Sequence, residues 1–387
     1  MKIGLLTFHF VPNYGASLQC YALWRHLMDK GHEAYVIDYR PLRFLYLVYR
    51  NCVFKPGIAR KLVRLPGTIK RREGFIRDRW RERIRRQQRM LEWTQNHVAL
   101  TPARYHTRTS LASLCDTFDV LIAGSDQIWD LSNTNGRDPA YFLDFADNTT
   151  VRLVTYGASA GSLETFGRDA EIMAALVKRH HRVSVRDQHT QALAAREFGL
   201  TCPQVVDPTW FLDFAPLCGA RLVDEDYLLV NGEFRSNDPL RRARRMADEM
   251  NLKLVSVGPP DPVADISFSS ARQEEWLSLH AHARYVVTNL YHGAIFAIQF
   301  GKPFTALSYP NRWRKISHLL AETGLTSRLH LLPDALEEPV SHWIHPGTED
   351  VKKGRELMTP RVAQAKHFLE EALAPVPGEE TGGVHEA

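Results

Sequence analysis

The first forty residues set out three secondary-structure elements in order. Residues 2–8 form an apolar run suited to a buried strand, and residues 16–30 carry apolar side chains at helical spacing before Gly31. Residues 33–41 form a second run rich in β-branched and aromatic side chains. A strand, a helix and a strand in this order predict a βαβ unit of a parallel sheet, whose ligands bind at the carboxyl ends of the strands.

The same alternation continues along the chain. Residues 42–100 are predicted to be helical and mostly polar, and further strands are predicted at 118–125, 151–159, 181–187 and 203–210. The pattern restarts after a hinge expected at 216–225. Strands then follow at 226–232, 253–258, 285–290 and 303–309, with helices at 238–251, 274–283 and 292–301.

The length predicts more than one domain. A chain of 387 residues exceeds what one hydrophobic core usually serves. We therefore predict two Rossmann-like, doubly wound α/β domains that face one another across a cleft. The first comprises residues 1–217 with a basic helical insertion at 55–95, and the second comprises residues 218–375 with a final helix at 360–373. The composition of residues 376–387 predicts a disordered tail.

Composition and cysteine spacing exclude several classes of protein. Hydrophobic residues make up 44% and charged residues 24%, as in globular proteins, and no run of about 18 apolar residues is present to span a bilayer. His9, Pro12 and Asn13 interrupt the N-terminal apolar run, so we expect no signal peptide and a cytoplasmic location. The five cysteines are scattered and odd in number, which disfavours a disulfide framework and a zinc site.

Positive charge is concentrated in one segment. Between Lys55 and Arg89 the chain has fourteen Lys or Arg against Glu73, Asp78 and Glu82, whereas the whole protein carries a net charge of +5. Three interpretations stay open: a solvated helical face, attraction to anionic lipids, or binding to nucleic acid. Apolar residues alternate with the cations, which favours lipid over nucleic acid, so we expect peripheral contact with an anionic membrane through residues 60–89 and no nucleic-acid partner.

A histidine stands where a predicted strand meets a predicted helix. His292 follows the strand at 285–290 and precedes Gly293. The first backbone N–H groups of a helix have no intrahelical partners and bind anions, and glycine lets an anion approach closely. An imidazole beside an anion can exchange a proton near neutral pH. The alternative is a histidine that only caps or packs.

Two other strand ends carry charged residues. Arg186 ends the strand at 181–187, where its planar guanidinium suits a carboxylate or phosphate, although an ion pair with Asp187 explains it equally well. Asp207 ends the segment at 203–210, near the hinge, where it would cap the chain turn or touch a ligand.

A polar cluster follows the strand at 118–125. The run AGSDQIWD supplies Ser125, Asp126, Gln127 and the indole of Trp129, a combination suited to pairing with sugar hydroxyls and stacking on a sugar ring. A helix cap with Trp129 in the core is the other interpretation. Asn13 and Tyr14 follow the first strand and should border the same cleft.

Two further classes of site lack support. Asp38 ends the second strand of the βαβ unit, but the turn contains Gly15 without the other glycines of the dinucleotide fingerprint. No Walker loop, HExxH or GxSxG motif occurs, and the histidines form no cluster with metal-ligand spacing. We therefore expect neither a nucleotide cofactor nor a metal.

Taken together, these segments resemble the polysaccharide pyruvyl transferase family. The resemblance runs in order through KIGLLTFHFVPNYGASLQCYAL, VLIAGSDQIWD, VTYGASAG, VSVRDQHT, VVDPTWFL, EEWLSLHAHARYVVTNLYHGAIFAIQFGKPF, NRWRKISHLL and TGLTSR. Each motif is modest alone, and their order and spacing are specific.

The resemblance implies two Rossmann-like domains similar to those of GT-B glycosyltransferases. It also implies transfer of pyruvate from phosphoenolpyruvate, as co-substrate, onto two hydroxyls of a sugar as a cyclic ketal, with release of phosphate. The acceptor would be a precursor of a cell-surface or exopolysaccharide, often lipid-linked in the family. His292 would be catalytic, and the remaining assignments are donor binding by Arg186, Gly293, Asn289, Arg312 and Lys315 and acceptor binding by Asn13, Tyr14, Ser125, Asp126 and Gln127.

One departure from the family pattern affects the donor site. Many members carry arginine two residues before the histidine, where this chain has Leu290. Leucine cannot hold an anion, so the missing cation must be absent or supplied by Arg186, Arg312 or Lys315. Two alternatives to pyruvyl transfer remain: a GT-B glycosyltransferase that uses a nucleotide sugar, and an inactive family member that acts as a binding protein.

Overall fold

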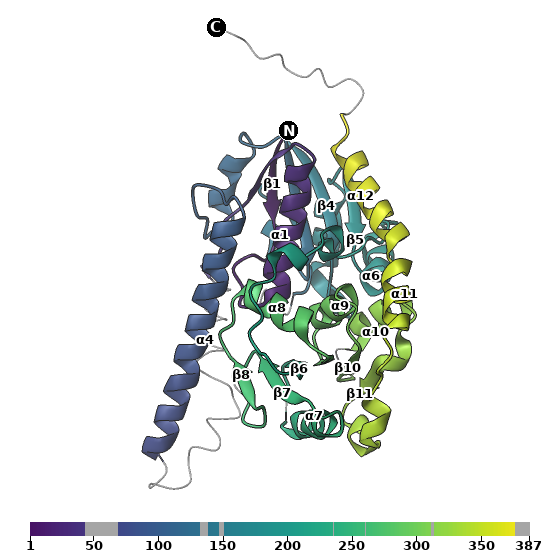
Figure 1. The fold of residues 1–387 in the computed structure, drawn as a ribbon. Coiled ribbons are helices and arrows are strands. Elements are labelled where there is room, and N and C mark those ends of the chain that lie inside the picture. The colour runs from purple at the N-terminus through teal and green to yellow at the C-terminus, as the bar shows by residue number, and fades with distance from the viewer. Residues whose placement is uncertain are drawn as a thin grey trace.

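Two parallel sheets, each flanked by helices, form the framework of the protein. The computed structural model describes residues 1–42, 69–131, 138–146, 151–234, 236–259, 261–310 and 313–375. Figure 1 shows the two sheets one above the other, with the N-terminal domain at the top. The prediction of two Rossmann-like α/β domains is confirmed.

The N-terminal domain contains a five-stranded sheet in the order β2-β1-β3-β4-β5, in which every neighbouring pair is parallel. Its strands are β1 (Lys2–Leu6), β2 (Glu33–Val36), β3 (Val120–Asp126), β4 (Arg152–Ala158) and β5 (Arg182–Val185). The helices that accompany them are α1 (Tyr14–Asp29), α4 (Ile69–His97), α5 (Ala170–Val177) and α6 (Gln188–Phe198).

The C-terminal domain contains a six-stranded parallel sheet in the order β11-β10-β9-β6-β7-β8. Its strands are β6 (Tyr227–Asn231), β7 (Lys253–Val257), β8 (Ile266–Phe268), β9 (Tyr285–Thr288), β10 (Phe304–Ser308) and β11 (Leu329–Leu331). Its helices are α7 (Asp238–Glu249), α8 (Gln273–His282), α9 (Tyr291–Gln299), α10 (Trp313–Glu322) and α11 (Glu349–Leu357), and α12 (Thr359–Leu373) follows.

One predicted strand is absent from the structure. In the segment 203–210, only Gln204 forms a bridge, with Val185, and Pro208–Phe211 makes a single 3-10 turn. Pro208 cannot donate a ladder hydrogen bond, and the Asp207 carboxylate instead caps the turn at Thr209. This prediction was therefore wrong, and the turn places Asp207 at the domain boundary.

The final helix, α12, packs on the N-terminal domain rather than on the C-terminal domain to which it was predicted to belong. The sequence analysis placed residues 360–373 with the C-terminal domain, whereas α12 packs its apolar face on the N-terminal core beside Ile3 and Leu5. Ion pairing between Lys30 and Glu370 supports the same contact. Figure 1 shows α12 running along the upper domain. The predicted tail at 376–387 and residues 43–68, which include the start of the predicted insertion, lie outside the described residues.

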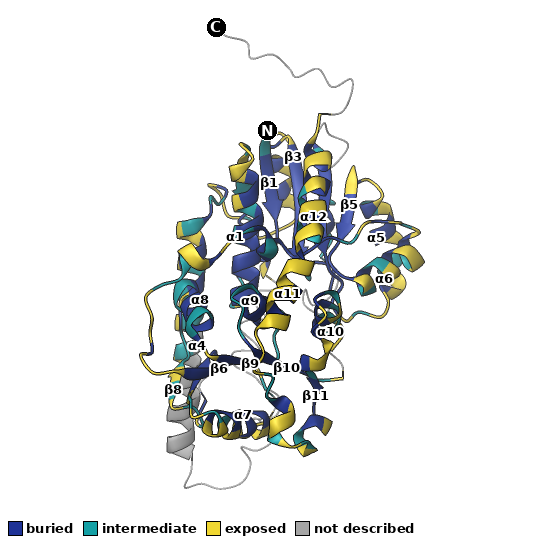
Figure 2. Cartoon of the chain, turned by 45° about the vertical axis from the view of Figure 1, so that its right-hand side comes forward, coloured by how far each residue is buried: buried dark blue, intermediate teal, exposed yellow. Residues whose placement is uncertain are grey.

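An apolar core joins the two domains. Tyr14 and Leu18 of α1 and Trp93 of α4 pack in one cluster with Trp276 and Phe296 of the C-terminal domain. The Tyr14 hydroxyl donates to the carbonyl of Ala271 over 2.8 Å. Figure 2 shows the strands buried and the outward faces of the helices exposed.

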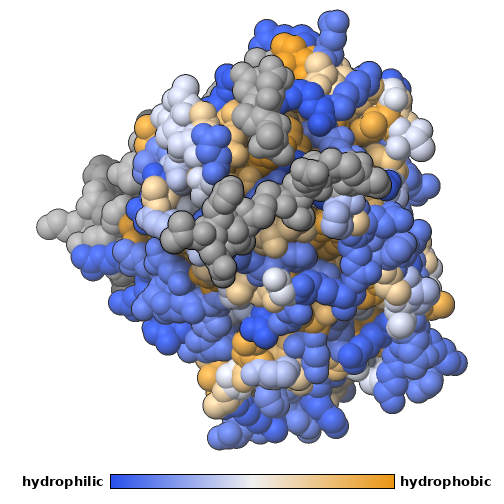
Figure 3. Space-filling model, turned by 90° about the horizontal axis from the view of Figure 1, so that it is seen from above, coloured by the Kyte–Doolittle hydropathy of each residue, from blue (hydrophilic) through white to orange (hydrophobic). Residues whose placement is uncertain are grey.

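The molecular surface is mainly hydrophilic on the face shown in Figure 3, where apolar side chains appear as separate patches. In the described part of the chain, no helix has both the length and the apolar character needed to cross a membrane.

Candidate active site at the domain interface

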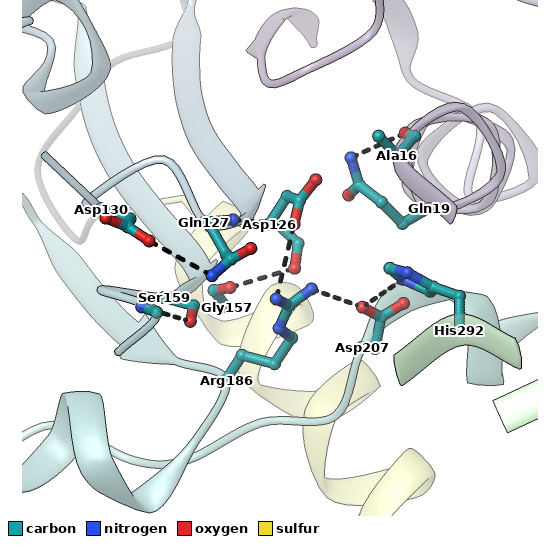
Figure 4. A network of polar contacts seen from close by, with 12 residues as sticks. Ala16, Gln19, Asp126, Gln127, Asp130, Gly157, Ser159, Arg186, Asp207 and His292 are labelled. Carbon is teal, nitrogen blue, oxygen red and sulfur yellow. Dashed lines mark hydrogen bonds and ion pairs between the residues drawn. The ribbon is translucent and has the colours of Figure 1, made fainter. Parts of the chain in front are cut away.

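Four ionisable side chains from the two domains form a continuous chain of contacts (Figure 4). Asp126 ends β3, and Arg186 directly follows β5 at the same edge of the N-terminal sheet. Asp207 precedes the 3-10 turn, and His292 lies in the first turn of α9 in the C-terminal domain. Parallel strands bring their carboxyl ends to one edge, which explains why residues so distant in sequence meet here.

Asp207 is the buried centre of this chain. Its Oδ2 accepts from His292 Nε2 at 3.2 Å and from Arg186 Nη1 at 2.7 Å, and its Oδ1 accepts from the backbone N–H and the hydroxyl of Thr209 at 3.0 and 2.7 Å. Burial by itself raises the pKa of this carboxyl, but His292, Arg186 and Thr209 outweigh burial and lower it. Because the folded pKa lies below the unfolded value of about 3.9, ionised Asp207 stabilises the fold at neutral pH, and this contribution is lost as the pH falls.

Both terminal nitrogens of the Arg186 guanidinium contact carboxylates of the protein. Besides Asp207, its Nη2 contacts Asp126 Oδ1 at 3.5 Å, and the group lies 5.1 Å from the ring centre of Tyr291. Burial opposes its charge, yet the two carboxylates outweigh burial and raise the pKa of Arg186. The predicted role as a clamp for a substrate anion does not fit a side chain that is only 3% exposed and already paired twice.

The two ring nitrogens of His292 contact different elements: Nε2 contacts Asp207, and Nδ1 packs against Gly15 of α1. Its Nε2–H donates to the Asp207 carboxylate, which leaves the lone pair on Nδ1. A Cβ added to Gly15 would lie 1.9 Å from Nδ1, so the imidazole packs directly on the first turn of α1. The N-termini of α1 and α9 thus converge on one imidazole. The predicted place of His292, at the junction of a strand and a helix, is confirmed.

Two predicted donor residues serve the local framework. A Cβ on Gly293 would meet Thr288 Oγ1 at 2.2 Å, so glycine is required for α9 to pack against the end of β9 rather than for an anion to approach its Cα. The Asn289 side chain donates to the carbonyl of Glu233 and accepts from its N–H, at 2.7 and 2.9 Å. Both groups are committed to joining the ends of β6 and β9.

Lys315 is the described donor candidate that carries an available charge. It lies in α10, is half-buried, and makes no ion pair with another described residue. Burial, aided by the nearby Arg186, lowers the pKa of its ammonium to about 8, while Asp187 and Asp126 oppose this effect. Arg312, the other proposed cation, lies outside the described residues.

The predicted acceptor residues divide into buried and accessible groups. Tyr14 stacks on Trp276 inside the domain interface, and Ser125 is fully buried with its hydroxyl bonded to the carbonyl of Gly157, so neither faces a ligand. Asn13 is exposed and caps α1, while Asp126 and Gln127 are partly exposed at the end of β3. These three stay candidates for acceptor binding.

The indole of Trp129 belongs to the core. It is fully buried and stacks on Phe142 with a centroid distance of 5.4 Å, as the alternative interpretation of the AGSDQIWD motif predicted.

Among the described residues, no group of three or more His, Cys, Asp or Glu is arranged to hold a metal ion.

Two contributors to the site are not among the residues predicted from the sequence. Gly15 was noted only as part of a dinucleotide turn, although a glycine in the first turn of a helix can signal close contact with another element. Thr209, in the VVDPTW motif, fixes Asp207 with two hydrogen bonds. A hydroxyl two residues after an aspartate that precedes proline was the available signal.

Fold and site together define a class of protein. Two parallel α/β domains whose site lies at their interface form a two-domain Rossmann-like architecture of the GT-B type. The model of the polysaccharide pyruvyl transferase family matches residues 13–311, and the chain belongs to this family. The family is one of transferases in polysaccharide biosynthesis, which implies a saccharide acceptor.

Several solved structures are similar to this chain. A putative UDP-N-acetylglucosamine 2-epimerase from Listeria monocytogenes covers 96% of this chain and 95% of its own, with 11% identity and a TM-score of 0.54. The UDP-GlcNAc 2-epimerase from Methanocaldococcus jannaschii covers 96% and 99%, with 12% identity and a TM-score of 0.48. A glycosyltransferase from Streptomyces sp. SF2575 covers 97% and 100%, with 13% identity and a TM-score of 0.46. A search of curated proteins gives no match.

Substitution of Gly15 by alanine tests the packing on His292. Because the new Cβ would lie 1.9 Å from Nδ1, we expect the imidazole to leave Asp207 and the protein to lose about 1–3 kcal/mol of stability through overpacking. A structure of the variant and urea unfolding measure both effects. In the control, Gly219→Ala, the nearest atom would be 3.4 Å away and no shift is expected. An unchanged contact between His292 and Asp207 would contradict this description of the site.

Proposed function

We propose that this protein transfers pyruvate from phosphoenolpyruvate to two hydroxyls of a saccharide, forming a cyclic ketal and releasing phosphate. The observation that carries the proposal is His292, paired with buried Asp207 where the N-termini of α1 and α9 converge. Membership of a transferase family with saccharide acceptors supports it.

The reaction requires proton transfers and the handling of two anionic groups. One acceptor hydroxyl adds to C2 of phosphoenolpyruvate while C3 gains a proton and becomes a methyl group. Phosphate then leaves C2, and the second hydroxyl takes its place. Of the two hydroxyl protons, one balances the proton gained at C3 and the other departs with phosphate.

His292 has the surroundings of a general acid and base. Asp207 accepts from its Nε2–H, which fixes the ring orientation, and we assign to this imidazole the donation of a proton to C3. Deprotonation restores a neutral imidazole that can accept the proton of the second hydroxyl. The packing of Gly15 against Nδ1 means that exchange at this nitrogen requires a small movement of α1 away from α9.

Lys315 and the first turn of α9 are the groups we assign to the anions of the donor. Leu290 lacks the cation of many family members, and Arg186 is already paired with Asp207 and Asp126. Lys315 therefore supplies the positive charge. The N–H groups at the start of α9 add partial positive charge, since helix N-termini attract phosphate and carboxylate.

Replacement of His292 tests the proposed function. We expect purified His292→Ala to release phosphate from phosphoenolpyruvate and acceptor at least about 100-fold more slowly than the parent, because general acid–base catalysis contributes this much or more. A coupled phosphate assay measures the rate. His342→Ala is the matched control, since His342 is exposed and lies outside the site. A near-parent rate for His292→Ala would refute its role.

A separate thermal-shift measurement distinguishes pyruvyl transfer from the two alternative functions. The true donor should raise the melting temperature by mass action, so phosphoenolpyruvate should stabilise the parent and UDP- or GDP-sugars should not. Stabilisation by a nucleotide sugar alone would favour a glycosyltransferase. Stabilisation by phosphoenolpyruvate without turnover of any acceptor would favour an inactive binding protein.

The pH dependence of donor binding tests Lys315. Its ammonium loses its proton above a pKa of about 8, so KM for phosphoenolpyruvate should be constant below pH 8 and rise about tenfold per unit above it. Lys315→Arg should remove this rise, because arginine stays charged. Lys178→Arg, at an exposed position, is the control. A KM that stays constant to pH 10 in the parent would exclude Lys315 as the anion-binding cation.

We also propose that α4 contacts anionic membrane surfaces. The helix has ten Lys or Arg against four Asp or Glu, while Arg86 and Arg89 near its C-terminal end bond to the carbonyls of Pro12 and Ser270. Figure 1 shows the N-terminal end of α4 at the lower left, beside the C-terminal domain. A basic helix of this kind is attracted to anionic lipid at about 1 kcal/mol per cation near the surface.

Liposome flotation measures this contact. The parent should float with anionic vesicles but not with neutral ones, and replacement by glutamine of Arg71, Arg72, Arg77, Arg79 and Arg81 should abolish flotation. A control of equal net charge replaces five exposed cations elsewhere, Lys178, Arg241, Arg245, Lys353 and Arg355. Equal flotation of both variants would show that overall charge, rather than α4, governs any attraction.

A further inference from the structure

The four ionisable residues of the site differ in exposure to solvent: the two in the middle of the chain of contacts are buried, and the two at its ends are partly exposed. Arg186 and Asp207, in the middle of the chain of contacts, have side chains that are 3% and 0% exposed. Asp126 and His292, at its two ends, are 13% and 12% exposed. Only the two ends are therefore positioned to meet a substrate.

The two ends also belong to different domains. Asp126 lies at the end of β3 in the N-terminal domain, and His292 lies in the first turn of α9 in the C-terminal domain. Arg186 bonds to Asp126 with one terminal nitrogen and to Asp207 with the other. One buried guanidinium thus fixes the distance between the carboxylate at one end and the imidazole at the other.

The Asp126 carboxylate is oriented by one of its oxygens. Oδ1 accepts from the backbone N–H of Gln127 at 2.8 Å and contacts Arg186. No described residue donates a hydrogen bond to Oδ2, which leaves this oxygen for a ligand. The backbone of Asp126 has a φ of 82°, in the left-handed region that residues other than glycine adopt infrequently and that is enriched at functional sites.

We propose that Asp126 is the general base that takes the proton of the attacking acceptor hydroxyl, opposite His292 as the acid, and that Arg186 is a positioning residue for both. This inference rests on the proposed function and names a role within it. It also changes two sequence predictions, since Asp126 becomes catalytic rather than only acceptor-binding and Arg186 no longer binds the donor.

The proton balance fits this division of roles. In the first addition, the hydroxyl oxygen bonds to C2, Asp126 takes the hydroxyl proton, and His292 gives a proton to C3. When phosphate leaves, it carries away the proton held by Asp126. The second hydroxyl then bonds to C2, and its proton returns His292 to the imidazolium form, so both residues end as they began.

Steady-state kinetics of Asp126→Asn test the role of the base. With phosphoenolpyruvate and acceptor, we expect kcat to fall at least about 100-fold, whereas KM for phosphoenolpyruvate stays within about threefold of the parent value. Asp126→Glu should recover part of kcat, because it restores a carboxylate. Asp126→Ser provides a second variant if asparagine disturbs the fold, and Asp224→Asn, at an exposed position, is the control.

Arg186→Lys separates positioning from donor binding. A positioning residue should lower kcat and leave KM for phosphoenolpyruvate unchanged, whereas a donor clamp should raise that KM. A kcat of Asp126→Asn within threefold of the parent, or a raised acceptor KM at unchanged kcat, would overturn the role of Asp126. Parent protein that releases no phosphate with any acceptor would instead refute the proposed function, and this inference with it.

Discussion

The site depends on one buried negative charge. Asp207 lies between the domains with no exposed side-chain surface, so its carboxylate must be compensated by neighbours. Arg186 supplies compensation from the N-terminal domain and His292 from the C-terminal domain. Removal of Arg186 or His292 would leave the buried carboxylate incompletely paired. The local structure of each domain therefore has to hold its own partner of Asp207 in place. The same contacts therefore join the domains and orient the imidazole.

The framework around this charge consists of ends of secondary-structure elements. Parallel sheets bring the ends of β3 and β5 to one edge, and α9 begins directly after β9 with its N-terminus facing α1. Glycines permit the close contacts: Gly15 admits the imidazole, and Gly293 admits Thr288. The apolar cluster around Tyr14 and Trp276 packs the two domains against one another.

Local patterns in the sequence predict most of the framework. The alternation of strands and helices predicts both sheets, and the position of His292 follows from the junction of a strand and a helix. The partner of this histidine could not be predicted, because Asp207 is 85 residues distant and lies in the other domain. Arg186 was recognised as a cation at a strand end, but only the fold shows that it is buried and that two carboxylates occupy its guanidinium.

The other differences between the predicted and the observed fold also have physical causes. The apolar segment around Val205 and Val206 resembles a strand, yet Pro208 and the capping Asp207 turn the chain. The apolar face of α12 gives no indication of which domain it will cover, and packing on the N-terminal core decides this. A short edge strand such as β11 contains too few residues for a periodic pattern to appear.

The proposed reaction requires that a proton reach C3 of phosphoenolpyruvate as its C2 joins a sugar. Reaction in D₂O with phosphoenolpyruvate labelled with ¹³C at C3, followed by NMR and mass spectrometry of the saccharide product, tests it most directly. We expect a ketal whose labelled methyl group carries one deuterium. A product that retains the labelled carbon as a methylene group, or that contains none of it, would contradict the account.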